Sequence, residues 1–169
     1  EENLAQMQKQ ADSGDADAQY HLGVIYLTGG HVQKDVAKGL EWLQKAVAQG
    51  NADAQFFLGL MYHLGEEGVP KNVAKAMEWY QKAATQGDAR AQHSLGKMYE
   101  SGESTPKNVR KAVEWYQKAA MQGYAKAQSK LGFMYNIGEG VPKDAAKAAE
   151  WYQKAAVQGE AVAQFNLGL

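Results

Sequence analysis

The stretch AKAQSKLGFMY, residues 125–135, is one copy of a pattern that recurs along the chain as Ala-x-Ala-Gln-x-x-Leu-Gly-x-x-Tyr. Other complete copies begin at Ala16, Ala52 and Ala89, and a shortened copy begins at Ala161, so successive copies start 36, 37, 36 and 36 residues apart. A period of this length is typical of stacked helix pairs, because one pair cannot bury its apolar face alone and neighbouring pairs build a shared core. The repeat therefore predicts an all-α solenoid of stacked antiparallel helix pairs.

The recurring pattern predicts the first helix of each repeat. In the first copy Ala18, Leu22, Ile25 and Tyr26 fall on one face of an α-helix. The glycine of the pattern costs a helix about 1 kcal/mol relative to alanine, so its recurrence predicts that the backbone of another helix approaches closely there. This glycine stands at residues 23, 59, 96, 132 and 168.

The second helix of each repeat carries a tryptophan among alanines. In the third repeat Ala112, Trp115, Tyr116, Ala119 and Ala120 share one helix face, which predicts that the tryptophan is a core residue. On the opposite face a glutamate stands four residues before a lysine, and these pairs predict a solvated surface. They occupy positions 41 and 45, 78 and 82, 114 and 118, and 150 and 154.

The residues between the helices predict where each helix begins and ends. Glycine follows each second helix, at residues 14, 50, 87, 123 and 159, where a left-handed residue is favoured. Asp15, Asn51 and Asp88 come next and are predicted to cap the following helix, whereas Tyr124 and Glu160 in the same position are predicted to cap poorly. Proline stops the first helix at residues 70, 106 and 142, and aspartate or asparagine at 35, 72, 108 and 144 is predicted to cap the second helix.

Composition excludes several classes of function. Lys+Arg 18 against Asp+Glu 19 gives a net charge of -1, so the chain has no overall positive field that would attract nucleic acid. It has no cysteine, which excludes disulfides, thiolate metal sites and a cysteine nucleophile. No apolar run approaches the roughly 20 residues of a membrane span, and no signal peptide is found. Because the chain starts at Glu1 and not at methionine, we expect an N-terminal segment to have been removed.

Three motifs together resemble the Sel-one-like repeat (SLR) family, which is related to the tetratricopeptide repeats. They are the pattern quoted above, the loop GEGVPKD at residues 138–144, and the helix motif Ala-x-x-Trp-Tyr-x-Lys-Ala-Ala-x-Gln-Gly at residues 148–159. The resemblance covers essentially the whole chain and divides it as a single repeat domain, 1–169. A truncated repeat contributes its second helix at residues 1–14. Four full repeats follow at 15–50, 51–87, 88–123 and 124–159. A truncated fifth repeat starts at 160–169. We expect both ends to be cuts through a longer array, because a polar capping helix is missing.

The resemblance implies a right-handed, tetratricopeptide-like α-α superhelix that serves as an adaptor in protein complexes, often in bacteria at the periplasm or the cell surface. Some bacterial members carry a cysteine pair in each repeat, and a penicillin-binding or β-lactamase role is ascribed to that branch. This chain has no cysteine and departs from the branch.

In the related tetratricopeptide geometry the first helices line a concave groove, and the resemblance implies the same here. Positions on these helices outside the repeated core vary between repeats and are our candidate partner-binding residues. They are Asp17, Tyr20, Val24, Asp53, Phe56, Leu60, Arg90, His93, Lys97, Lys126, Ser129 and Phe133. An apolar end in the first two repeats and a basic end in the next two suit an extended peptide or partner helix with apolar anchors and acidic residues. The alternative is that Tyr20 and Phe56 fill gaps between repeats while the charges keep the groove hydrated.

The sequence contains no recognisable catalytic or metal site. The histidines at 21, 31, 63 and 93 lack metal-ligand spacing, the adjacent His93 and Ser94 lie on different helix faces, and no nucleophile or phosphate-binding motif occurs. We therefore expect no catalytic residue, no cofactor, no metal, no nucleic-acid partner and no membrane insertion. Our leading hypothesis is a non-enzymatic scaffold that binds a protein or peptide. A structural spacer array and a hydrolase such as a β-lactam-acting enzyme are the alternatives.

Overall fold

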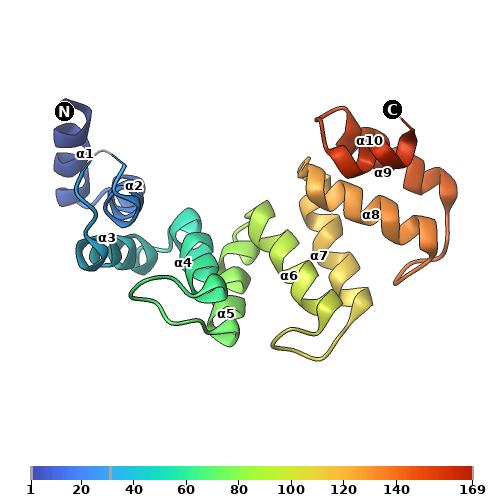
Figure 1. Ribbon diagram of the computed structural model, residues 1–169, viewed down its shortest axis with the longest axis horizontal. Helices are drawn as coiled ribbons and strands as arrows, with labels where there is room; N and C mark the ends of the chain where they lie inside the picture. Colours follow the sequence, from blue (N-terminus) through green and yellow to red (C-terminus); the bar gives the residue numbers. More distant parts are fainter. Residues whose placement is uncertain (1, 31, 169) are drawn as a thin grey trace. The chain divides into compact units, whose positions relative to one another are not determined.

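The computed structural model describes residues 2–30 and 32–168, and His31 lies outside these residues. Over the described residues the chain forms ten α-helices and one isolated bridge between Glu66 and Val69, without a strand (Figure 1), so the all-α prediction is confirmed. The helices are α1 (Glu2–Asp12), α2 (Ala16–Thr28), α3 (Val36–Ala48), α4 (Ala52–Leu64), α5 (Val73–Thr85), α6 (Ala89–Ser101), α7 (Val109–Met121), α8 (Ala125–Ile137), α9 (Ala145–Ala156) and α10 (Ala161–Leu167).

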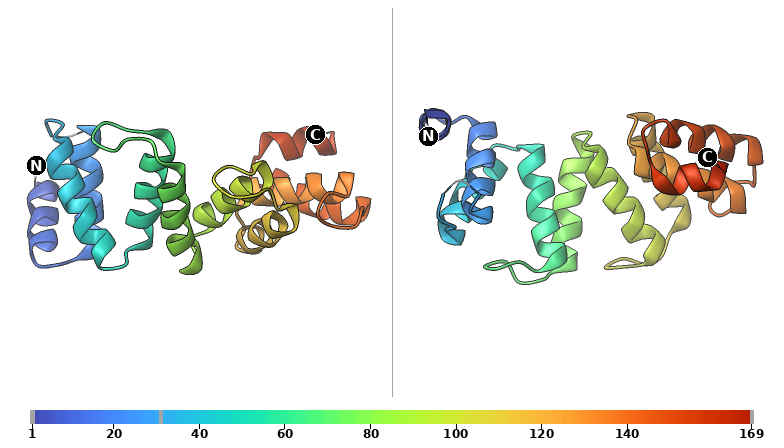
Figure 2. Two further views of the ribbon diagram at one scale, coloured as in Figure 1. Left: turned by 90° about the horizontal axis from the view of Figure 1, so that it is seen from below. Right: turned by 45° about the horizontal axis from the view of Figure 1, so that its top comes forward.

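The chain divides into two compact units, residues 1–83 and 84–169. In the first unit α2 packs against α1 and α3, and α3 packs against α4. In the second unit α7 packs against α6 and α8, and α9 packs against α8 and α10. Figure 2 shows these helices from two further directions. Each unit is therefore a series of helices in which neighbours in sequence are neighbours in space.

A backbone hydrogen bond closes each helix pair. The N–H of Asp35, just before α3, donates to the carbonyl of Tyr26 in the last turn of α2 over 2.9 Å. The N–H of Asn108, just before α7, donates in the same way to the carbonyl of Tyr99 in α6 over 2.8 Å. Because this bond joins the end of one helix to the start of the next, the two helices of a pair run antiparallel, as the sequence predicts.

Side-chain caps set the starts of the helices. Asp15, Asn51 and Asp88 each accept a hydrogen bond from the backbone N–H three residues on, as predicted. Tyr124 makes no such bond, also as predicted. The prediction for Glu160 is wrong, because its carboxylate accepts the equivalent N–H over 2.8 Å. The longer glutamate side chain folds back far enough to cap α10, and its charge also suits the positive end of the helix dipole.

The deepest side chain of a second helix is the tyrosine after the tryptophan. Tyr80 and Tyr116 are fully buried, whereas Trp79 and Trp115 are half-buried. The ammonium group of the lysine three residues after each tryptophan lies over its ring, 4.0 to 4.6 Å from the centroid. The prediction that the tryptophans are core residues is thus right for Trp42 alone, which is buried where a leucine replaces the tyrosine. Elsewhere the tyrosine fills the core and the tryptophan covers it under a lysine.

The glycines of three first helices, Gly59, Gly96 and Gly132, make room for the tyrosine of the following helix. A Cβ added at Gly96 would lie 2.5 Å from Cε1 of Tyr116, far inside van der Waals contact. The equivalent atom at Gly132 would lie 2.7 Å from the Tyr152 ring. The predicted close approach of another backbone occurs at Gly23, where an added Cβ would lie 3.1 Å from the carbonyl oxygen of Gly39 in α3, and at Gly59, where it would lie 3.3 Å from the carbonyl oxygen of Ala76 in α5.

The glutamine of the recurring pattern joins neighbouring helices, as Gln19, Gln92 and Gln128 show. Gln128 in α8 donates from Nε2 to the carbonyl of Ala120 in α7 over 3.1 Å. Its Oε1 accepts from Nε2 of Gln158, which follows α9, over 2.9 Å. Gln92 and Gln122 repeat the arrangement across α6 and α7 with an amide-to-amide bond of 2.9 Å. Because the Gln92 and Gln128 amides are buried and satisfied, they fix the register between successive helix pairs.

A candidate binding groove between two first helices

A groove with a volume of about 790 Å³ lies along α6 and α8 in the second unit. Residues three or four apart on each helix line it, since such residues share one helix face. The loops before α7 and α9 and the start of α10 complete it. Five of the candidate binding residues, His93, Lys97, Lys126, Ser129 and Phe133, come together here. The other lining residues are Glu100, Ser101, Lys107, Lys130, Glu139, Glu160 and Val162.

The carboxylates of this groove are engaged with partners of their own. Glu100 forms an ion pair with Lys130 over 2.7 Å and accepts a hydrogen bond from the hydroxyl of Tyr116 over 2.6 Å. Glu139 lies 3.9 Å from Lys107, and Glu160 caps α10. Burial, with help from Glu100, raises the pKa of the Tyr116 hydroxyl well above its usual value, so this hydroxyl remains a hydrogen-bond donor. The groove therefore holds few carboxylate oxygens that could receive a basic ligand.

His93 lies in the groove as a neutral imidazole. Its pKa is lowered to about 4, chiefly by burial and also by the nearby ammonium groups of Lys97, Lys126 and Lys130, while Glu100 opposes the shift. Its ring also contacts the rings of Tyr116 and Tyr124, with centroids 5.6 and 5.3 Å apart. At neutral pH His93 offers one donor and one acceptor nitrogen, surrounded by positive potential.

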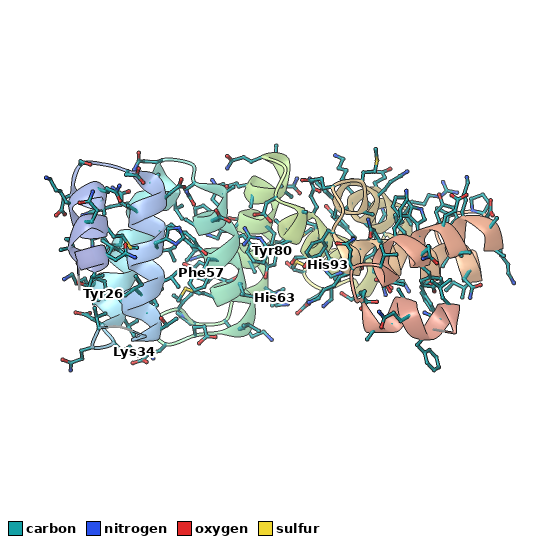
Figure 3. The ribbon with its side chains drawn as sticks, turned by 90° about the horizontal axis from the view of Figure 1, so that it is seen from above. Tyr26, Lys34, Phe57, His63, Tyr80 and His93 are labelled. Carbon is teal, nitrogen blue, oxygen red and sulfur yellow. The ribbon has the colours of Figure 1, made fainter. Side chains whose placement is uncertain are left out.

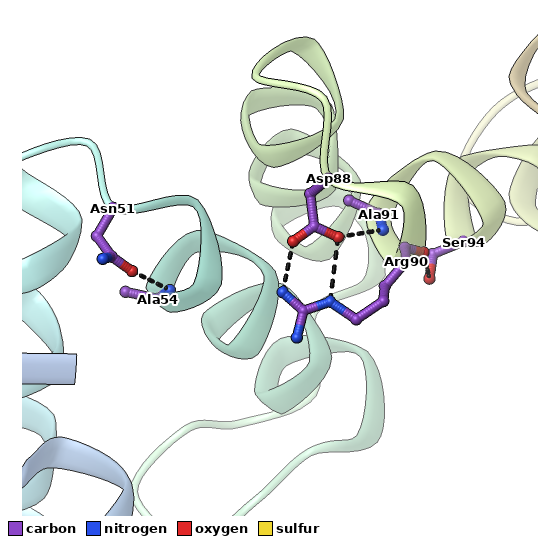
Figure 4. A network of polar contacts seen from close by, with 6 residues as sticks. All are labelled: Asn51, Ala54, Asp88, Arg90, Ala91 and Ser94. Atoms are coloured by element: carbon purple, nitrogen blue, oxygen red, sulfur yellow. Dashed lines mark hydrogen bonds and ion pairs between the residues drawn. The ribbon is translucent and has the colours of Figure 1, made fainter. Parts of the chain in front are cut away.

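Arg90 pairs with Asp88, two residues earlier in the sequence, and is not among the residues that line the groove. Its guanidinium donates to both carboxylate oxygens of Asp88, which also caps α6 through the N–H of Ala91 (Figure 4). The hydroxyl of Ser94 donates to the carbonyl of Arg90 over 2.9 Å in the next turn. Because Asp88 neutralises the Arg90 guanidinium within the first turn of α6, the basic character of the groove comes from its lysines.

In the first unit the two aromatic candidates lie against other rings. The Tyr20 centroid is 6.2 Å from that of Phe57 in an edge-to-face arrangement, and Tyr20 packs against the buried cluster of α3 and α4. The Phe56 centroid is 5.7 Å from that of Tyr80. Figure 3 shows His63 of α4 directed toward Tyr80 of α5, and His63 Nδ1 lies 3.3 Å from the Tyr80 hydroxyl. These contacts match the alternative in which Tyr20 and Phe56 fill spaces between helices.

The remaining candidates of the first unit are dispersed. The carboxylate of Asp17 accepts a hydrogen bond from Nδ2 of Asn51 over 2.7 Å, Val24 is half-buried and Asp53 is exposed. Leu60 lines a smaller pocket of about 180 Å³ with residues from the end of α2, the start of α3 and the loop after α4. The apolar patch expected from the first two repeats is therefore reduced to this small pocket.

Several residues of the groove are not among the candidates predicted from the sequence. Lys130 stands four residues after Lys126 on the same face of α8, so the helical spacing alone could have indicated it. Lys107 and Glu139 come from the loops before α7 and α9, and no helical pattern places them. Among the described residues no group of three or more histidine, aspartate or glutamate side chains could hold a metal ion. None of the described helices has the length and hydropathy of a transmembrane segment.

Comparisons with known proteins match the repeated architecture. The family model of the Sel1 repeat matches residues 16–51, 52–88, 89–124 and 125–160. No curated protein matches the chain at a significant level.

Solved structures with the same fold extend over nearly the whole chain. A protective antigen present in uropathogenic Escherichia coli strains, with an SLR fold, is 41% identical with a TM-score of 0.92 and covers 98% of this chain. A Sel1 repeat protein from Oxalobacter formigenes is 39% identical with a TM-score of 0.93 and covers 99% of this chain. The chain spans only 35% and 49% of these two proteins. Immunity protein Pa5087 from Pseudomonas aeruginosa is 28% identical with a TM-score of 0.64, covering 96% of this chain and 60% of its own.

Proposed function

The chain belongs to the Sel1 repeat family, and from this premise we propose that it is a protein-binding module that holds a segment of a partner in the α6–α8 groove. Sel1 repeat proteins mediate protein–protein interaction and are generally non-enzymatic scaffolds. The observation that carries the proposal is the groove itself, where residues that differ from repeat to repeat gather beside one another.

Shape and chemistry of the groove favour a partner segment. A volume of about 790 Å³ is of the order of several side chains, and the groove combines exposed lysines with the exposed ring of Phe133. Phe133 is 42% exposed, although a large aromatic ring on a folded surface is stabilised by burial. A partner that covers this ring gains apolar contact area while the lysines remain available to its polar groups.

The two alternatives place different demands on the same residues. A spacer array needs only the packed interior, so replacing exposed groove residues would leave its role unchanged. A hydrolase needs a nucleophile beside a base, and the described His93 and Ser129 line the groove without a hydrogen bond between them. Turnover of a chromogenic β-lactam at high protein concentration would support the hydrolase.

Site-specific photo-crosslinking tests the proposal. A benzophenone amino acid is introduced at Phe133 in the groove and, as the matched control, at Met121, which is 75% exposed on α7 outside the groove. Each variant is irradiated in an extract of the native host, and covalent adducts are separated and identified. We expect a discrete adduct from position 133 and none of the same identity from position 121. Equal labelling from both positions, or no adduct from position 133, contradicts the proposal.

A further inference from the structure

Two lysines of the α6–α8 groove carry unneutralised charge. Lys97 on α6 and Lys126 on α8 are both exposed, and neither forms an ion pair with any described residue. Lys130, one turn after Lys126 on α8, is paired with Glu100, which also accepts a hydrogen bond from the Tyr116 hydroxyl. The arrangement leaves a positive strip across the groove, although the whole chain has a net charge of -1.

The positive potential is focused on His93. Lys97, Lys126 and Lys130 all act on the imidazole, and Glu100 is the opposing carboxylate. The rings of Tyr116 and Tyr124 also contact the imidazole. A neutral imidazole can donate its single N–H to an anion, which an ordinary apolar residue at this position could not do.

Apolar surface lies directly beside this positive strip. Phe133 stands one helical turn beyond Ser129 on α8, and the Lys130 ammonium lies 5.6 Å from its ring centroid. Val162, at the start of α10, is 57% exposed and lines the same groove. A ligand that fits must therefore present negative charge next to an apolar group.

We propose that the occupant of the groove is an acidic segment of a protein partner. An aspartate or glutamate side chain of this segment lies between Lys97 and Lys126 over His93, and an adjacent apolar side chain covers Phe133 and Val162. This inference rests on the binding function proposed above and adds the chemistry of the partner. Charge complementarity selects it, because Lys97 and Lys126 have no ion-pair partner among the described residues while each carboxylate of the groove already has a partner.

The same charges disfavour other occupants. Glu100, Glu139 and Glu160 line the groove, so a polyanion such as nucleic acid, whose phosphates follow one another closely, would meet these carboxylates as well as the lysines. A basic segment would meet Lys97 and Lys126 directly and find Glu100 already engaged. A short segment with isolated carboxylates satisfies the lysines without approaching the glutamates.

Selection from a random peptide library tests the inference while the partner itself is unidentified. A displayed library of random dodecapeptides is selected on the full chain, and enriched peptides are synthesised and measured by fluorescence anisotropy. They are then measured against the double variant Lys97→Glu/Lys126→Glu and the matched control Lys143→Glu/Lys147→Glu. The control makes the same charge change at exposed positions outside the groove. Circular dichroism checks that both variants remain folded, and Lys97→Met/Lys126→Met replaces the first variant if it does not.

We expect enriched peptides that contain aspartate or glutamate next to an apolar residue. Their affinity should fall at least about tenfold in the groove variant, which corresponds to about 1.4 kcal/mol, because both attractive ion pairs are lost and the charge reversal adds repulsion. It should change less than about twofold in the control.

The outcomes separate this inference from the proposed function. Peptides that crosslink from position 133 but lack acidic residues leave the groove as the binding site and overturn the acidic partner. Acidic peptides that bind the groove variant and the control equally well also overturn it. If no peptide is enriched, or enriched peptides crosslink from position 121 and not from position 133, the proposed function fails and the inference fails with it.

Discussion

Replacing Gln128 by glutamate exchanges one amide nitrogen for oxygen at the joint between α7, α8 and α9. Gln128 is buried, donates to the carbonyl of Ala120 and accepts from Gln158. Glutamate keeps the size of the side chain and the acceptor for Gln158. When ionised, however, it places a negative oxygen where an N–H had faced the Ala120 carbonyl. The variant therefore removes one hydrogen bond and buries one charge without creating a cavity.

The magnitude follows from these two changes. The lost bond to Ala120 costs about 1 kcal/mol, because that carbonyl still accepts from the N–H of Gly123 over 3.0 Å. Burial of the carboxylate beside a carbonyl oxygen adds roughly 2 kcal/mol, so the free energy of unfolding should fall by about 3 kcal/mol at pH 7. Protonation restores a donor toward Ala120, and the pKa of this carboxyl should therefore rise above its usual value of about 4.3 in the folded state.

The pH dependence gives the prediction its sharpest test. A folded-state pKa raised by about 2 units corresponds to roughly 3 kcal/mol. The loss of free energy of unfolding in the variant, relative to the unmodified chain, should thus be complete above about pH 6.5 and vanish as the pH falls toward about 4.3. Urea denaturation followed by circular dichroism measures it, with Gln117→Glu on the exposed face of α7 as the control at each pH. A deficit within about 0.5 kcal/mol of the control at pH 7, or one that is equal at both ends of the pH range, would refute the reasoning.

Four further predictions address the core, the glycine, a cap and a titrating group. Tyr116→Ala should lower the free energy of unfolding by about 3–5 kcal/mol, and Trp115→Ala should lower it by clearly less. If urea denaturation shows the larger loss for Trp115→Ala, Trp115 and not Tyr116 is the main core residue. Gly96→Ala should destabilise by about 1–3 kcal/mol, since the added Cβ meets the Tyr116 ring at 2.5 Å, whereas a gain in thermal stability would mean that the ring moves freely. Glu160→Ala should weaken α10 by about 1 kcal/mol, visible as faster amide hydrogen exchange there, and unchanged exchange would show that its cap contributes nothing. Because the pKa of His93 lies near 4 and below its ordinary 6.5, the unfolded chain binds the proton first. Stability should therefore decline as the pH falls from 6.5 to 4, and His93→Gln should flatten that part of the profile; an unchanged slope would assign it to other groups.

The helices and most of their caps could be predicted because they depend on short-range chemistry. The Ala-x-Ala-Gln pattern, its period, and the glycine, proline and capping residues between the helices predict the helix pairs. Asp88 caps α6 as its position indicates. Glu160 shows where this reasoning stops, because capping preferences by residue type do not anticipate a longer side chain folding back. Local pattern therefore predicts helix boundaries well and individual side-chain geometry less well.

Depth within the core could not be predicted from helical spacing alone. Trp115 and Tyr116 lie on the same stripe, and only the rotation of α7 against α6 decides which of them is buried. That rotation is set by Gly96, which accepts the Tyr116 ring against its backbone. The sequence shows the glycine and the aromatic pair, but their contact joins two different helices.

The candidate site was predictable as a face and not as a set of contacts. Spacing on α6 and α8 brought His93, Lys97 and Phe133 to one surface, and the structure places them along one groove. Spacing could not reveal that Asp88 holds Arg90, or that Tyr116 donates a hydrogen bond to the carboxylate paired with Lys130. Those interactions decide which charges remain available, and they depend on the geometry of individual side chains.

The most direct measurement is a nuclear magnetic resonance titration of the full chain, labelled at histidine, with an acidic peptide obtained by the library selection. The ring resonances of His93 should shift in proportion to the bound fraction, while those of His21, exposed on α2, should stay in place. Saturation of the protein with peptide while the His93 resonances remain unmoved would show that the partner binds elsewhere.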